Sequence, residues 1–81
     1  MDRITAFGQV IRKERRAKGI SQEELAELAN LHRNFISMVE RGASKIALDS
    51  LFALADALEI SASTLLRRAE AAAKSTPPEA H

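Results

Sequence analysis

The sequence predicts an all-α protein that forms a compact bundle of five helices. Apolar residues recur at three- and four-residue spacing through most of the 81 residues, and no stretch alternates like a half-buried strand. Glycines and helix-capping residues interrupt this pattern at intervals of one helix length. A chain of this length makes one domain. We expect the domain over residues 1–73 and a disordered tail over residues 74–81, which contains both prolines.

The first helix is predicted over about residues 4–18, with Gly19 as the left-handed residue that ends it. Ser21 and Glu24 have the spacing of a capping box, which predicts the start of a second helix. Asn30 stands where the next turn needs a left-handed residue, and asparagine tolerates that conformation. The residues predicted to face inward are Ile4, Phe7, Val10, Ile11 and Ala17 in the first helix and Leu25, Ala26, Leu28 and Ala29 in the second.

The third helix, over about residues 32–41, has the clearest division between its two faces. At about 100° per residue, Phe35, Ile36 and Val39 fall on one side. The outer arc carries basic and polar side chains with one methionine: Arg33, Asn34, Ser37, Met38 and Arg41. Such a helix suits insertion into the major groove of DNA. Taken alone, it fits an ordinary amphipathic helix with a solvated face equally well.

Two more helices follow a loop at residues 42–46. The fourth is predicted over about residues 47–58, and Ser61 or Ser63 caps the fifth. The apolar residues that mark these helices are Leu48, Leu51, Phe52, Leu54, Ala55 and Leu58 in the fourth and Leu65, Leu66, Ala69, Ala72 and Ala73 in the fifth.

Composition excludes several classes of protein. The chain has no cysteine and only two histidines, so we expect no disulfide, no metal site and no catalytic residues. No apolar run approaches the roughly 18 to 20 residues of a membrane span, and no secretory signal is visible. Little chain remains for a ligand pocket. We therefore expect a cytoplasmic protein with no cofactor, no small-molecule ligand and no membrane contact.

The formal net charge of +1 hides an uneven distribution. Residues 19–32 and 46–66 contain acids and no lysine or arginine, whereas basic side chains dominate residues 1–18. Folding could therefore separate a basic face from an acidic one, which net charge does not reveal. The charged residues of the first segment are Arg3, Arg12, Lys13, Arg15, Arg16 and Lys18 against Asp2 and Glu14.

From about Phe7 to Leu66 the chain resembles the Cro/repressor helix-turn-helix family, the Xre-like regulators. The marks are Ile11-Arg12 and Arg15, the run from Gly19 to Ala26, Ile36-Ser37, Glu40-Arg41-Gly42, and the leucine and alanine pattern from Leu48 to Leu58. The stretch from His32 to Ser37, with Ile46 where many relatives have proline, looks most like controller proteins of restriction-modification systems. The chain departs from the family at His32 and Ala47, which replace the better caps of two helices, and at Met38.

The resemblance implies a lambda-repressor-like fold and a sequence-specific transcriptional regulator, a repressor or activator rather than an enzyme. Its expected partners are double-stranded DNA with a palindromic operator and a second copy of the chain. One alternative is an antitoxin-type interaction module whose DNA binding is secondary autoregulation. A second is a helical adaptor that does not bind DNA.

Four residues of the third helix are expected to read bases. The guanidinium fork of Arg33 matches the O6 and N7 acceptors of guanine, with a phosphate clamp as the alternative. Asn34 would read adenine or hold a phosphate. Ser37 is small enough for close approach and can meet a base or a phosphate. Met38 would touch a thymine methyl group, or remain an idle surface residue.

The resemblance makes Gln22 a phosphate contact, aided by the amides of a helix N-terminus. Arg41 and Lys45 lie where the DNA backbone should pass, and solvated surface charges are the alternative. Arg15 and Glu40 match positions that form a partly buried ion pair in the family. For the dimer interface we expect the end of the fourth helix and the fifth helix to supply Ile60, Leu65, Leu66 and Ala69, although some of these also serve the monomer core.

Overall fold

The computed structural model describes residues 1–75 as five α-helices without a strand, which confirms the predicted fold class. The helices are α1 (Arg3–Ala17), α2 (Gln22–Ala29), α3 (Arg33–Glu40), α4 (Leu48–Leu58) and α5 (Ala62–Lys74). Lys74, which we expected in the tail, is the last residue of α5. Ser75, also expected in the tail, is the C-cap of α5, and residues 76–81 of the predicted tail lie outside the described residues.

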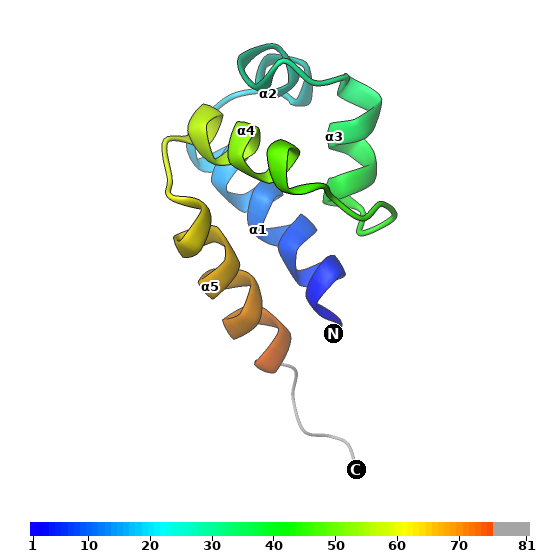
Figure 1. The fold of residues 1–81 in the computed structure, drawn as a ribbon, viewed down its shortest axis with the longest axis vertical. Helices are drawn as coiled ribbons and strands as arrows, with labels where there is room; N and C mark the ends of the chain where they lie inside the picture. Colours follow the sequence, from blue (N-terminus) through cyan, green and yellow to red (C-terminus); the bar gives the residue numbers. More distant parts are fainter. Residues whose placement is uncertain (76–81) are drawn as a thin grey trace.

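The helix α1 is the centre of the arrangement (Figure 1). It packs along α5, which runs beside it in the opposite direction, and also against α3, while α2 contacts both α3 and α4. The five largest fully buried side chains come one from each helix: Ile11, Leu25, Ile36, Leu54 and Leu65. All five helices therefore share one core, in which each such side chain stabilises the fold by about 1.5 to 3 kcal/mol.

Local hydrogen bonds explain where most of the helices begin. The Asp2 carboxylate accepts from the Thr5 amide at 2.8 Å, and Ser61 caps α5. Ser21 and Glu24 form the predicted capping box at the start of α2. The remaining two helices, α3 and α4, follow His32 and Ala47 and have no side-chain cap.

Two non-glycine residues hold left-handed backbone conformations at helix ends. Asn30 has φ 57° and ψ 45° and ends α2, as the sequence predicted. Glu59 has φ 60° and ends α4, which the sequence did not predict. Glutamate rarely adopts this conformation, and here the turn is closed by backbone hydrogen bonds from Glu59 N–H to the Asp56 carbonyl at 3.1 Å and from Ile60 N–H to the Ala55 carbonyl at 3.0 Å.

Three apolar residues predicted to face inward, Ile4, Ala17 and Leu28, are instead exposed, and so are Leu48 and Phe52 of α4. The exposed fractions are 41% for Ile4, 61% for Leu28, 66% for Leu48 and 51% for Phe52. The prediction failed because each short helix buries only a narrow arc against its neighbours. In α4 that arc is occupied by Leu51, Leu54, Ala55 and Leu58. Leu48 and Phe52 lie one turn apart beside it. Over residues 1–75, no helix has the length and apolar character needed to cross a membrane.

Candidate nucleic-acid interface

The outer arc of α3 presents the residues that were predicted from the sequence to read bases. Ile36 and Val39 are buried in the core and fix the inner side of the helix. Arg33 and Asn34, in the first turn, are exposed, and Met38 is 38% exposed. Ser37 lies half-buried among them. The structure thus gathers the four predicted base-reading side chains on one helix face, where their roles stay predictions.

Glu40, the last residue of α3, forms a buried ion pair with Arg15 of α1. Arg15 donates from Nε to Glu40 Oε2 at 2.7 Å and from Nη2 to Oε1 at 3.1 Å, and its Nη1 donates to the Ile20 carbonyl at 2.9 Å. The Glu40 side chain is fully buried. Burial alone would raise the pKa of Glu40, but the Arg15 and Gln22 hydrogen bonds and the Arg15 charge hold it below its usual value. Glu40 is therefore a carboxylate at neutral pH.

The same carboxylate accepts hydrogen bonds from two further side chains. Gln22, the first residue of α2, donates from Nε2 to Glu40 Oε1 at 3.1 Å. Arg12 of α1 approaches the same oxygen with its Nε at 3.4 Å. The carboxylate therefore connects the end of α3 with α1 and the N-terminus of α2. No role was predicted for Arg12 from the sequence, although it lies one turn before Arg15 and shares a helix face with it.

Directly after Glu40, the chain enters a loop that carries two predicted phosphate contacts. Arg41 and Lys45 are both exposed, and Arg41 Nε donates to the Ser37 carbonyl at 3.3 Å. Gly42 turns the chain here with φ +71°, and a Cβ on it would lie 3.0 Å from Thr5 Cα. Gln22, which is bonded to Glu40, and the two cations of this loop therefore all lie near the C-terminal end of α3.

The crossing of α1 and α3 depends on Gly8, to which no role was assigned from the sequence. A Cβ atom at this position would lie 2.2 Å from the Val39 carbonyl oxygen, closer than atoms can approach. The absent side chain lets the backbones of the two helices touch. A glycine inside a helix that otherwise contains good helix formers was the available signal, because glycine costs about 1 kcal/mol there relative to alanine.

The predicted dimer interface requires correction. Leu65 is fully buried and Ala69 is 3% exposed, because both fill the monomer core between α5 and its neighbours. Neither can offer surface to a second copy in this conformation. Leu66 is 45% exposed and Ile60 is half-buried. Of the assigned residues, only these two remain available.

Comparisons with known proteins agree with this geometry. The family model described as helix-turn-helix matches residues 11–65. The control protein C.SmaI of Serratia marcescens is 40% identical over 68 residues, which cover 84% of this chain and 81% of that protein. The control protein C.BamHI of Bacillus amyloliquefaciens is 41% identical over 61 residues, covering 74% and 75%. The crystal structure of the restriction-modification controller protein C.AhdI from Aeromonas hydrophila matches with a TM-score of 0.75 at 44% identity, covering 76% of this chain and 94% of that one.

Proposed function

Because the chain belongs to the Cro/C1-type helix-turn-helix family and is a DNA-binding regulator, we propose that it acts as a homodimer on a palindromic operator. Its relatives are control proteins and transcriptional regulators, and the chain, like them, is not an enzyme. We also propose that it controls genes of a restriction-modification system. This second proposal is supported by the similarity to C.AhdI, which is a restriction-modification controller protein.

The outer arc of α3 is the observation that carries this proposal. The inner side of α3 is fixed in the core by Ile36 and Val39, and the end of α3 is fixed by the buried Glu40. The helix therefore presents the outer arc on a rigid support. A rigid helix with exposed Arg33 and Asn34 in its first turn fits the major groove, where these side chains can reach base edges. Arg33 reads guanine in this proposal, while Asn34, Ser37 and Met38 contact neighbouring bases.

Phosphate groups on either side of the groove would hold the helix in register. Gln22 sits at the N-terminus of α2, where backbone amides and the helix dipole favour an anion. Arg41 and Lys45 supply positive charge at and beyond the C-terminal end of α3. Such contacts position the protein on the duplex, and the base contacts then select the sequence.

Dimerisation is proposed because one recognition helix covers only a few base pairs. Two copies related by two-fold symmetry would place their α3 helices about 34 to 36 Å apart, in successive major grooves. For the contact surface we propose Leu48 and Phe52 of α4, in place of the buried Leu65 and Ala69. Leu48 and Phe52 are both largely exposed and lie one turn apart on α4, so together they form a continuous apolar strip.

Footprinting on the DNA immediately upstream of the protein's own gene tests this function. We expect protection of a palindrome whose half-sites lie about one helical turn apart. The variant Arg33→Ala should bind about 1 to 3 kcal/mol more weakly per contact and lose its preference at one base pair of each half-site. Lys45→Ala should weaken binding to all sequences alike. Binding that shows no sequence preference, with a neighbouring gene product that co-purifies, would support the antitoxin-type alternative instead.

A further inference from the structure

The outer face of α1 carries three cations that the contacts proposed above do not use. At about 100° per residue, Arg12, Lys13 and Arg16 fall with Gln9 within an arc of about 100°, turned away from the core residue Ile11. The four side chains line one shallow hollow of about 360 Å³. We call Arg12, Lys13 and Arg16 the α1 basic face.

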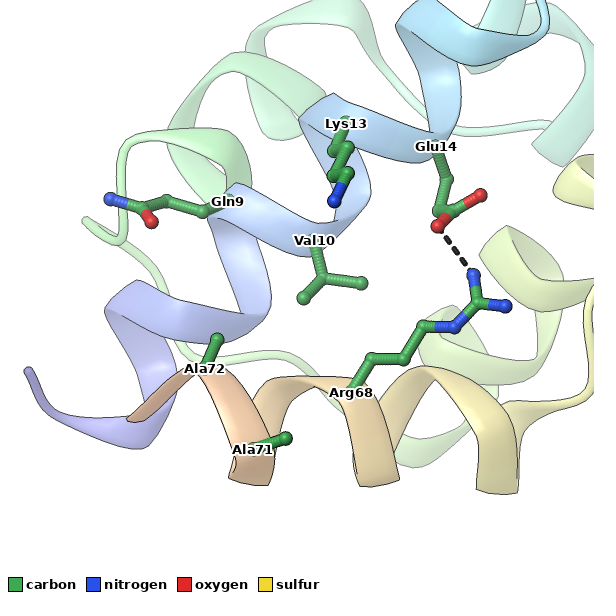
Figure 2. Close-up of a pocket in the computed structure, with 7 residues that line it drawn as sticks. All are labelled: Gln9, Val10, Lys13, Glu14, Arg68, Ala71 and Ala72. Carbon is green, nitrogen blue, oxygen red and sulfur yellow. Dashed lines mark hydrogen bonds and ion pairs between the residues drawn. The ribbon is translucent and has the colours of Figure 1, made fainter. Parts of the chain in front are cut away.

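Two of the three charges of this face, those of Lys13 and Arg16, are not neutralised by any ion pair within residues 1–75. Lys13 and Arg16 are exposed, and within residues 1–75 neither has an ion pair or a side-chain hydrogen bond. Glu14, the acid adjacent to them in sequence, turns toward α5 and pairs with Arg68 (Figure 2). Lys13 lines the groove between α1 and α5 with its side chain directed toward it (Figure 2), and no ion pair joins it to that carboxylate among the described residues.

Arg12 joins the basic face to the proposed DNA interface. Its Nε approaches Glu40 Oε1, the oxygen that also accepts from Gln22 at the start of α2. Its side chain is 41% exposed, and its two terminal nitrogens have no hydrogen-bond partner among the described residues. A guanidinium held at Nε can present its remaining donors to an anion outside the protein.

We propose that the α1 basic face binds a stretch of DNA phosphodiester backbone continuous with the phosphate at Gln22. The inference rests on the proposed function and extends it with a sequence-independent contact. Cations without an interleaved aromatic or acidic side chain suit a phosphate backbone rather than base edges. An acidic protein surface would satisfy the same charges. DNA is favoured because Arg12 and Gln22 share one carboxylate oxygen, which places the face beside the interface.

The test compares two double variants that remove equal charge. Lys13→Gln/Arg16→Gln alters the basic face, and Arg67→Gln/Lys74→Gln removes two exposed cations from the side of α5 turned away from α1. Affinity for a random-sequence duplex is measured at several salt concentrations. Each lost phosphate contact should make the slope of log affinity against log salt shallower by about 0.9. We expect a reduction of about 1.8 per protomer for the first variant and a much smaller one for the second.

A separate Arg12→Gln variant should also lose about 0.9 of slope per protomer. Its melting temperature, measured alongside, shows that α1 and α3 remain packed. If Lys13→Gln/Arg16→Gln keeps the slope of the control variant, the inference is overturned and the face serves another acidic partner. If the wild type itself binds the duplex without salt dependence, the proposed function fails instead.

Discussion

At the scale of single residues, bracing and reading are assigned to different arginines. Arg15 is 9% exposed and binds Glu40 through two nitrogens, whereas Arg33 is exposed and free to face a ligand. The variant Arg15→Ala strands the buried carboxylate and should cost about 3 to 5 kcal/mol of unfolding free energy. Arg33→Ala should change it by less than about 0.5 kcal/mol. Thermal unfolding of both variants checks this, and equal losses would contradict the division of roles.

The same ion pair predicts how stability depends on pH. The pKa of Glu40 lies below its usual value in the folded state, so the folded state binds the proton less readily than the unfolded chain. The stabilisation is therefore complete above the unfolded pKa of about 4.3 and is lost as the pH falls through the folded pKa. The difference in unfolding free energy between the wild type and Glu40→Gln should be largest near neutrality and shrink below about pH 4. Urea titrations across this range measure it, and a constant difference would count against the assignment.

At the scale of helices, the crossing of α1 and α3 sets where the recognition helix stands. Gly8→Ala would place a methyl group against the Val39 carbonyl, so the two helices must separate. In an exposed helix the same change stabilises by about 1 kcal/mol. At Gly8 we instead expect the unfolding free energy to fall by about 1 to 3 kcal/mol, as at other overpacked sites. Gln9→Ala, the next and exposed position, is the control and should be nearly neutral. A gain in melting temperature for Gly8→Ala would show that the contact is loose.

At the scale of the whole molecule, the two-fold assembly decides whether two α3 helices can reach one operator. Phe52→Asp puts a charge in the proposed α4 strip and should shift the protein from dimer to monomer in sedimentation at low micromolar concentration. Leu28→Asp is the matched control, since Leu28 is 61% exposed on α2, outside that strip, and its replacement should leave the dimer intact. If Leu66→Asp dissociates the dimer and Phe52→Asp does not, the dimer interface is formed by α5 rather than by the α4 strip. A monomeric wild type at tens of micromolar would exclude the dimer.

Features that depend on neighbouring residues could be predicted from the sequence without coordinates. The five helices, the capping box of Ser21 and Glu24, and the left-handed Asn30 follow from local hydrogen bonds and the period of the α-helix. The same period separates Arg33 and Asn34 from Ile36 and Val39, so the outer arc of α3 could be derived without coordinates. Such features form over one or two turns and need no knowledge of what packs against the helix.

Which part of each apolar stripe is covered depends instead on how the helices pack against one another. Leu48 and Phe52 are as apolar as Leu51, yet Leu51 is buried and they remain exposed, because packing covers only one side of α4. The need for glycine at position 8 and the shared carboxylate of Glu40 arise between helices far apart in sequence. Helical periodicity gives the direction in which a side chain leaves its own helix. Its partner is set by how the helices cross, because packing distances depend on the backbones of both.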